Sequence, residues 1–583
     1  MSSFYEDASL VVIPSGYKTS KIYAEKPTDG SGDLTFTRAS GATRVASNGL
    51  IEKVRTNQVL QSETLENAYW SKINVSVTAN AIANPVNGAT TADLLTVTDP
   101  SGPVEKTIAT SASQAFTAGV PYTASAYFKA GSITTTFRIL AYDGTTIYTS
   151  GTIDLATIGS STAPYVSLGN GWYRFSFTFT PSNSTSSGYV YFVNYAFGVA
   201  ANAGTNVYVY GTQIEAGDIA TAYIPTTTAA VSVGPVSNVP RLDYLGSTCP
   251  RLLLEPQRTN IVPYSEQLNN AAWTKLETNI TANDAVSPDG YTNADKFIAN
   301  TNNAAHLIYQ SVASGTYTFS IYAKAAGENV FSMWLNDFSK RALFDLSSGT
   351  VTTSNVTSSS ITSVGNGWYR CTVYDTSTTS FVAIYGRNAE SYAGNGTSGF
   401  LFWGAQCEAG AYATSYIPTT AASVTRVADT ASKTGISSLI GQTEGTLFVD
   451  FNYLGNIGAT ASVEAIPLYV GAGAFTDAIY FTVFQTNLYL VVWVGSVNQV
   501  TLNLGSISAG KHKASLSYIA NDFKVYFDGV LAGTDTSGSI PSLSAVYFGT
   551  AGTSTTPEAI SVNQALIFKT RLTNAQLAEL TTL

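Results

Sequence analysis

The strongest candidate for catalysis in the sequence is a pair of carboxylates, each two residues beyond a glutamine. Glu215 follows Gln213, and Glu408 follows Gln406. On an extended strand each Gln and Glu would share one face, and two carboxylates are the minimum for hydrolysis of a glycosidic bond. The alternative is structural: each carboxylate accepts hydrogen bonds from backbone groups, or binds a cation, at the end of a strand. The Gln-x-Glu motif occurs in both copies of a repeated module. This favours the structural alternative, because an active site need survive in only one copy.

The sequence has few histidine and cysteine residues that could take part in catalysis. His306 and His512 are the only histidines, and neither is flanked by a nucleophile motif. Cys249, Cys371 and Cys407 lack the spacing of a metal site, and their odd number excludes a complete disulfide framework. A reducing cytoplasm is therefore the expected place of synthesis. We expect a protein without enzymatic activity.

Aromatic side chains make up 12% of the chain, and exposed rings bind sugars by offering an apolar face and a polar tip. Two tryptophan pairs, Trp172 with Trp368 and Trp70 with Trp273, recur in both copies of the repeat and are therefore expected in the core. The rings with less reason to be structural are the candidates for glycan contact: Trp334, Tyr385, Trp403, Tyr489 and Trp493.

A structural Ca²⁺ is a further expectation, because carboxylate and carbonyl oxygens in β-sandwiches suit this cation. Asp450 and Asp528 are the candidate ligands. No other cofactor is expected.

The charge balance excludes several classes of protein. The net charge is −9 and only 11% of residues are charged, whereas a nucleic-acid partner requires a clustered basic face. The longest purely apolar run, 488–494, is far shorter than the roughly 20 residues that span a bilayer. The first residues have neither a basic region nor an apolar segment, so we expect no signal peptide.

The chain contains two copies of one module. Asn-Gly-Trp-Tyr-Arg at 170–174 recurs at 366–370, and Tyr-Ile-Pro-Thr-Thr at 223–227 recurs at 416–420. Several such matches, in the same order and with slowly drifting offset, indicate a duplication.

Alternating runs of about six residues, bounded by Gly, Asn and Pro, predict antiparallel strands with one buried face. The fold class is therefore all-β, with tandem jelly-roll β-sandwiches followed by another sandwich that ends in a short helix. The predicted domains are 1–57, which would pack with 236–257 if the first sandwich is an insertion; 58–235, the first jelly roll; 258–425, its duplicate; and 430–583.

Two families share motifs with the chain. Gly-Thr-Leu-Phe at 445–448, the strand pair ending at Asp528-Gly529, and the closing 565–580 resemble a concanavalin A-like lectin/laminin G domain. The segments 36–52 and 249–260, with the two Gly-x-Gln-x-Glu-Ala-Gly stretches, resemble tailed-bacteriophage virion proteins of the tail-fibre or head-fibre type. In that group the sandwiches resemble carbohydrate-binding modules.

These resemblances imply a structural virion protein, made in the host cytoplasm, whose segment 1–57 attaches to the particle. Its expected partners are other virion proteins and host-surface polysaccharide, with no nucleic acid and no membrane insertion. A homo-oligomer, a trimer by the same resemblance, is expected to bind the host surface as an adhesin. Two alternatives stay open: a capsular-polysaccharide depolymerase that uses Glu215 or Glu408, and a purely structural capsid or collar decoration.

Overall fold

The computed structural model describes residues 2–99, 105–110, 114–132, 134–195, 202–335, 340–387, 391–454, 464–549 and 558–583. These residues form β-strands, the helices α1 (Ser2–Asp7) and α2 (Asn574–Thr581), and the 3₁₀ turns η1 (Ile158–Ser160) and η2 (Ser437–Leu439), so the predicted all-β class is confirmed. The chain divides into unit 1 (Met1–Lys53, Pro235–Gly290 and Ala294–Leu583) and unit 2 (Val54–Gly234 with Tyr291–Asn293). Across the described ranges, no helix combines the length and the hydropathy that crossing a membrane requires.

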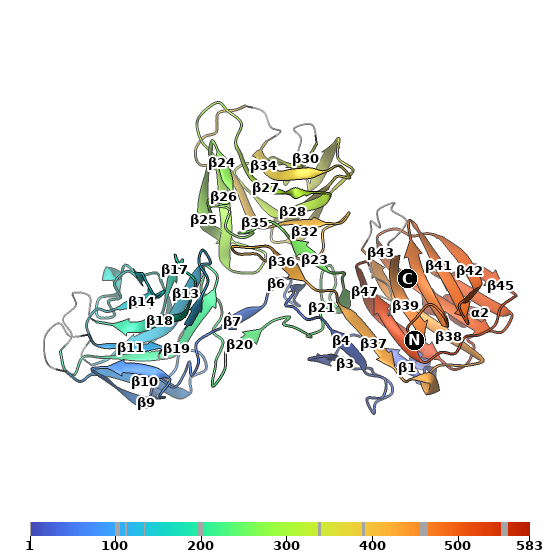
Figure 1. The fold of residues 1–583 in the computed structure, drawn as a ribbon, viewed down its shortest axis with the longest axis horizontal. Helices are drawn as coiled ribbons and strands as arrows, with labels where there is room; N and C mark the ends of the chain where they lie inside the picture. The colour runs from blue at the N-terminus through green and yellow to red at the C-terminus, as the bar shows by residue number, and fades with distance from the viewer. Residues whose placement is uncertain are drawn as a thin grey trace. The chain divides into compact units, whose positions relative to one another are not determined.

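Unit 2 is a β-sandwich, drawn in blue to green in Figure 1. One sheet has the order β16-β17-β13-β19-β10-β9, and the other β15-β14-β18-β11-β8, with β12 also pairing β18. The strands of the first sheet are β9 (Val75–Ala83), β10 (Thr90–Val97), β13 (Tyr122–Ala130), β16 (Tyr165–Gly169), β17 (Trp172–Phe179) and β19 (Asn206–Ala216). Those of the second are β8 (Trp70–Ile73), β11 (Thr107–Thr110), β12 (Gln114–Phe116), β14 (Arg138–Tyr142), β15 (Ile147–Thr149) and β18 (Thr185–Asn194). A two-stranded pair, β7 (Arg55–Asn57) with β20 (Val231–Val233), joins the two ends of the unit.

The second sandwich lies in unit 1 and repeats this topology. Its first sheet has the order β25-β26-β35-β28-β33-β32, which matches β9-β10-β19-β13-β17-β16 strand for strand, and its second has the order β24-β27-β34-β29-β30-β31. The first comprises β25 (Thr278–Val286), β26 (Thr292–Ala299), β28 (Tyr317–Ala326), β32 (Ser358–Gly365), β33 (Trp368–Tyr374) and β35 (Gly399–Ala409). The second comprises β24 (Thr274–Leu276), β27 (Leu307–Gly315), β29 (Val330–Leu335), β30 (Arg341–Asp345), β31 (Thr350–Ser354) and β34 (Thr379–Gly386), and β23 (Arg258–Asn260) pairs with β36 (Val424–Arg426). The repeated tryptophans Trp70, Trp172, Trp273 and Trp368 are all buried, as predicted.

The C-terminal sandwich takes strands from outside the predicted range 430–583. Its eight-stranded sheet has the order β21-β22-β47-β38-β43-β44-β45, with β1 also pairing β47, and its nine-stranded sheet has the order β2-β3-β4-β37-β46-β39-β40-β41-β42. The first comprises β1 (Leu10–Val12), β21 (Leu242–Asp243), β22 (Arg251–Leu254), β38 (Glu444–Tyr453), β43 (Gly510–Ile519), β44 (Asp522–Phe527), β45 (Val530–Asp535) and β47 (Ile560–Phe568). The second comprises β2 (Tyr17–Lys18), β3 (Lys21–Ile22), β4 (Leu34–Thr37), β37 (Thr430–Thr434), β39 (Glu464–Gly471), β40 (Ala478–Phe484), β41 (Asn487–Val494), β42 (Val497–Ser506) and β46 (Ala545–Gly549). Strands from 1–57 and 236–257 thus extend both sheets of this sandwich and cover edges that would otherwise be open.

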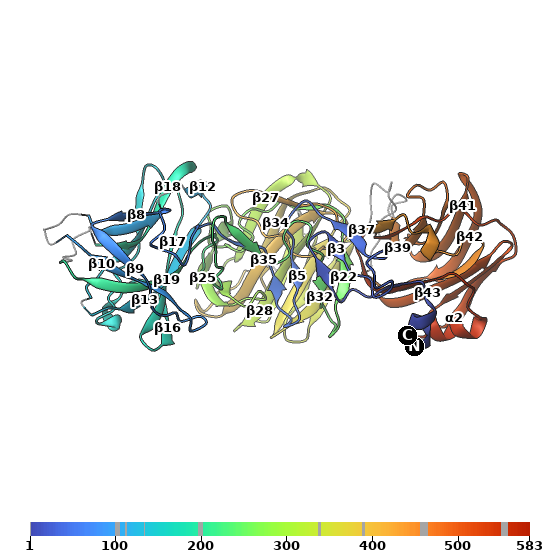
Figure 2. The same cartoon turned by 90° about the horizontal axis from the view of Figure 1, so that it is seen from below.

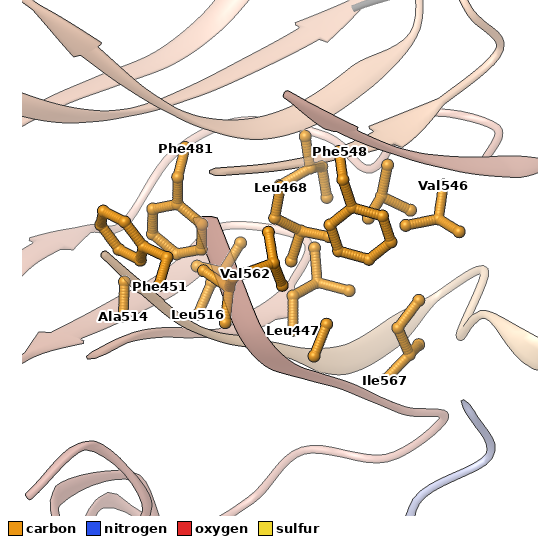
Figure 3. Packing of buried hydrophobic residues seen from close by; sticks show 14 of the residues in the cluster. Leu447, Phe451, Leu468, Phe481, Ala514, Leu516, Val546, Phe548, Val562 and Ile567 are labelled. Carbon is orange, nitrogen blue, oxygen red and sulfur yellow. The ribbon is translucent and has the colours of Figure 1, made fainter. Parts of the chain in front are cut away.

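The core of this sandwich lies between its two sheets. Figure 3 shows Phe451, Leu468, Phe481, Phe548 and Val562 pointing toward one another, and all five are buried. Burial of side chains of this size stabilises by about 1.5–3 kcal/mol each. The core is therefore built from alternate residues of the strands in both sheets.

Two local signals in the sequence of the C-terminal sandwich form the structures that they favour. Asp528 and Gly529 both have positive φ, 47° and 85°, in the turn between β44 and β45, which is the geometry that favours Asp-Gly in a two-residue hairpin. The N-cap Thr573 and Gln576, three residues apart, form a capping box at the start of α2. Figure 2 shows both termini beside α2, where the first residues and α2 share one hydrophobic cluster.

A fully buried ionic network ties the N-terminal segment to the rest of unit 1. Arg38 donates to Asp429 (2.9 Å), which Arg241 also contacts. Glu255 accepts from Arg241 (2.6 Å) and from Arg426 (2.8 Å). Although burial opposes ionisation, Arg426 and Arg241 hold the pKa of Glu255 well below its usual range. These five charged residues come from three distant stretches of sequence, around 38, 241–255 and 426–429, so the network forms only when unit 1 is assembled.

Candidate functional site

The two Gln–Glu pairs make the same hydrogen bonds in both copies. Gln406 Nε2 donates to Glu408 Oε1 (2.5 Å), and Thr414 donates its amide to Oε1 (2.8 Å) and its hydroxyl to Oε2 (2.6 Å). The amide of Ile417 donates to Gln406 Oε1 (2.6 Å). Gln213, Glu215, Thr221 and Ile224 repeat all four bonds at 2.5 to 2.8 Å.

Both glutamates are therefore occupied in fixing the loop that follows the last strand of their sandwich. Glu215 and Glu408 are buried, and every carboxylate oxygen accepts at least one hydrogen bond. They belong to different units of the fold. This is the hydrogen bonding that the structural interpretation of the motif requires.

Three of the five predicted glycan-contact rings are buried. Trp334, Tyr385 and Trp403 are 1%, 4% and 0% exposed. Trp334 packs against Tyr385, with ring centroids 4.7 Å apart, and lies under the guanidinium of Arg341. Trp403 packs against Tyr322 and is covered by Lys53. Because none of the three offers a ring face to solvent, we correct the expectation that they are available to stack on a sugar.

The other two predicted rings, Tyr489 and Trp493, lie together on the outer surface of the nine-stranded sheet. On β41 the residues between them, Leu490 and Val492, point into the core, so strand alternation places Tyr489 and Trp493 on the opposite face. Both are half-buried. Four further aromatic residues pack on the same face, and we call the whole set the aromatic face: Tyr469, Phe475, Tyr480, Tyr489, Trp493 and Tyr547.

Cross-strand register brings the aromatic face together. Tyr469 lies opposite Tyr547 on one side and Tyr480 on the other, with ring centroids 5.5 and 5.7 Å apart. Trp493 Nε1 donates to the Tyr480 hydroxyl (3.3 Å), and Asn503 Nδ2 donates to the Tyr489 hydroxyl (3.4 Å). The result is a run of rings with indole, phenol and amide groups at its margin. Tyr469 and Tyr480 are buried beneath this run. The half-buried rings Phe475, Tyr489, Trp493 and Tyr547 are therefore those that can offer an apolar face to the C–H groups of a sugar, with the polar tips of Tyr and Trp available to its hydroxyls.

Sequence reasoning did not select Tyr469, Phe475, Tyr480 and Tyr547. Their positions in alternating runs were the available signal, since Tyr480 and Tyr547 alternate with core residues on β40 and β46. The pairing of β39 with β46 could not be inferred from the sequence pattern, because it joins residues almost 80 positions apart, such as Tyr469 and Tyr547.

The two aspartates expected to bind Ca²⁺ have other partners. Asp450 accepts from Asn563 Nδ2 (2.6 Å) and pairs with Lys511 Nζ (3.3 Å). Asp528 accepts from the ring of His512 (2.7 Å) and from a backbone amide. Within the described ranges, no three His, Cys, Asp or Glu residues are grouped as a metal ion would require. The donor set around Asp450 and Asp528, with cationic neighbours at each, does not fit Ca²⁺.

His512 forms a pH-sensitive contact in the C-terminal sandwich. Its Nδ1 bonds Asp528 (2.7 Å) and its Nε2 bonds the Ser508 carbonyl (2.8 Å), so two acceptors face the ring and favour the doubly protonated form. Although burial opposes the charge, these bonds raise the pKa of His512 above its ordinary value of 6.5. The stabilisation is therefore fully present below about pH 6.5 and is lost as the pH rises through the folded pKa.

We expect His512→Gln to speed hydrogen exchange of residues 510–527 at pH 6 and to have progressively less effect as the pH approaches 9. The measurement is the ratio of exchange rates in variant and parent at each pH, which cancels the intrinsic pH dependence of exchange. A ratio that stays constant from pH 6 to 9 would contradict the assignment.

Comparisons with known proteins identify no family for the chain. No protein-family model and no curated protein matches it. Among solved structures, the CBM40 module of Ruminococcus gnavus IT-sialidase, bound to α2,3-sialyllactose, is 15% identical over 25% of this chain and 86% of the module, with a TM-score of 0.22. The leech intramolecular trans-sialidase is 15% identical over 24% of this chain and 23% of its own, with a TM-score of 0.21. The receptor-binding domain of botulinum neurotoxin mosaic serotype C/D is 10% identical over 26% of this chain and 40% of its own, with a TM-score of 0.22. Likenesses at these scores carry no argument about function.

Proposed function

We propose that the chain is a non-enzymatic structural protein of a phage particle, in a tail or head fibre or appendage, that adheres to host-surface polysaccharide through the aromatic face. The single observation that carries the adhesive role is this face, where Tyr489 and Trp493 lie half-buried beside polar groups. The fibre-type motifs at 36–52 and 249–260 support the place in the virion.

The absence of hydrolysis is part of the same proposal. Glu215 and Glu408, the carboxylates a depolymerase would use, are buried and hydrogen-bonded on all oxygens. A general acid or nucleophile needs access to the glycosidic oxygen or anomeric carbon. Their hydrogen bonding supports a binding protein over an enzyme.

Adhesion by a face of this kind gains strength from repetition. A single shallow aromatic surface binds weakly, and several copies on one particle raise the effective affinity without new contacts. The proposed homo-oligomer, a trimer, would present one aromatic face per chain, with other virion proteins as its partners in the particle.

The test is binding of the full chain to a microarray of bacterial surface polysaccharides, followed by calorimetry with the polysaccharide retained best. Trp493→Ala and Tyr489→Ala are each expected to weaken binding about tenfold or more, because a buried aromatic contact contributes roughly 1.5–3 kcal/mol. Tyr165→Ala is the matched control, since Tyr165 is an exposed ring (40%) in unit 2.

Three outcomes would contradict the proposal. Equal binding by parent and Trp493→Ala would remove the aromatic face from recognition. Release of reducing ends from the retained polysaccharide would replace adhesion with depolymerisation. If the parent protein retained no polysaccharide, the remaining interpretation would be a purely structural decoration of the particle.

A further inference from the structure

A cavity of about 550 Å³ lies within unit 1, separate from the aromatic face. Its volume falls within the roughly 300–1,000 Å³ typical of small-molecule sites. It is lined by strands β28, β33 and β32 of the second sandwich, by the β21–β22 hairpin, and by residues 43–51 and 411–416. Nothing in the proposed adhesion through the aromatic face uses it.

The sheet wall of the cavity carries a row of hydroxyls. On β32 and β33 the residues Ile361 and Cys371 point into the core of the second sandwich. Strand alternation therefore turns Ser360, Thr362 and Thr372 to the other face, where they line the cavity. Ser360 lies directly opposite Thr372 in the register. No hydrogen bond occupies these three hydroxyl groups among the residues that the structure describes.

Arg370 lies in the same row, opposite Thr362 on one side and Tyr322 on the other. Its guanidinium lies over the Tyr322 ring, 5.3 Å from the centroid, and its Nη2 donates to Ser320 (3.1 Å). Its Nε is buried and has no partner, and Nη1 has no acceptor within the described part of the chain. No carboxylate of the described residues forms an ion pair with Arg370.

The duplicated module supplies an internal comparison. Arg174 occupies the equivalent position in unit 2, and its Nη1 donates to the Thr221 carbonyl (2.5 Å) while Nη2 donates to Ser125 (2.9 Å). In the second copy the equivalent carbonyl, that of Thr414, instead accepts from Gln406 (3.4 Å). The Nη1 donor that is used internally in unit 2 is therefore left available in Arg370, where the cavity lies.

The β21–β22 hairpin contributes a second available cation. Arg251 donates only a long bond to the Leu245 carbonyl (3.4 Å). Its cross-strand neighbour Asp243 has both oxygens engaged by the backbone amides of Val45 and Leu245. Tyr244 adds a phenol to the lining.

The remaining charges of the lining are neutralised inside the protein. Arg44 pairs with Glu52 (2.7 Å), and Glu255 is held by Arg241 and Arg426. The cavity thus has available guanidinium groups, unoccupied hydroxyls and carboxylates that are already engaged.

We propose that this cavity binds an acidic sugar unit, a pyranose ring that carries a carboxylate. Arg370 and Arg251 pair with the carboxylate, a geometry that guanidinium groups favour. Ser360, Thr362 and Thr372 exchange hydrogen bonds with the ring hydroxyls. This site is independent of the aromatic face.

The experiment uses the exposed Cys249 as a reporter. Cys249 lies on the β21–β22 hairpin next to the cavity, whereas Cys371 and Cys407 are buried, so a maleimide fluorophore labels Cys249 in the folded full chain. D-glucuronic acid and D-glucose are titrated as matched probes, with calorimetry on unlabelled protein in parallel. Glucuronic acid is expected to give a saturable signal, and glucose at least about tenfold weaker binding, because a charge-assisted bond contributes roughly 1.5–3 kcal/mol.

Arg370→Ala is expected to weaken glucuronic acid binding about tenfold or more, and Thr362→Val, which keeps the shape of the side chain, severalfold. Arg174→Ala is the matched control and leaves binding unchanged, as does Trp493→Ala, which separates this site from the aromatic face. The proposal is overturned if glucose binds as well as glucuronic acid, if neither probe binds in either measurement, or if Thr362→Val and Arg370→Ala both bind like the parent.

Discussion

Replacing Asp429 with alanine is expected to lower the free energy of unfolding of unit 1 by about 3–5 kcal/mol, the range for breaking a buried ion pair by removing one partner. Asp429 is 3% exposed and contacts both Arg38 and Arg241. Without it, the buried Arg38 has no carboxylate partner, and Arg241 and Arg426 share the single carboxylate of Glu255. The loss is large because a buried charge left without its partner keeps the full desolvation cost.

Urea unfolding of the full chain measures the loss of stability. Hydrogen exchange of β4 and β37 is measured in a second experiment, because these two strands pair and lie directly next to Arg38 and Asp429 in the sequence. Asp535→Ala is the control, since Asp535 only bonds Ser537 in an exposed turn, and it should change stability by less than about 0.5 kcal/mol. Asp429→Asn keeps the size of the side chain and should fall between the two. A loss below about 1 kcal/mol for Asp429→Ala would show that the network does not hold the N-terminal segment in place.

The strands that could be predicted from sequence are those whose own residues carry the pattern. The run 478–484 is almost continuously apolar and forms β40, in which Ile479, Phe481 and Val483 face the core between the sheets while Ala478 and Tyr480 pack on the other face. The duplication was equally visible, because two copies of one fold keep the same buried tryptophans, such as Trp172 and Trp368. Local pattern and repetition therefore sufficed for the fold class.

The N-terminal strands could not be predicted in this way. β2 and β3 are two residues long and carry no periodicity. β4 pairs with β37 at a separation of almost 400 residues, and β1 pairs with β47 across more than 550. Such short segments become strands because they pair with the edge of a sheet, and that edge is formed by a distant part of the sequence.

The same distance explains the error on Trp403. Its duplicate is Tyr210, and Trp403 was among the rings with less reason to be structural. Ile51 and Lys53 from the N-terminal segment instead pack on Trp403. By contrast, Tyr489 and Trp493 share one strand, so their common face followed from spacing alone. A side chain's exposure is predictable only where its covering residues are local.

The glutamate of the repeated Gln-x-Glu motif carries the second large expected effect. Glu408→Ala is expected to destabilise the second sandwich by about 3 kcal/mol or more, because it leaves three buried donors, one from Gln406 and two from Thr414, without an acceptor at roughly 1–3 kcal/mol each. Glu215→Ala should cost unit 2 a similar amount, since the same bonds recur there. Hydrogen exchange of β35 and β19 reports the two sandwiches separately.

Comparing the stability losses of Glu408→Ala and Glu215→Ala distinguishes a structural motif from a catalytic one. A structural motif predicts matched losses of stability in both copies and binding of polysaccharide that persists in whatever fraction stays folded. A catalytic carboxylate predicts the opposite in one copy, since removing a desolvated charge from an active site commonly leaves stability unchanged or improved while activity disappears. Near-neutral stability for Glu408→Ala with a large loss for Glu215→Ala would therefore point to chemistry in the second sandwich. Equal losses of stability in both copies would show that the motif is structural and stabilises each sandwich, as the repeated buried tryptophans do.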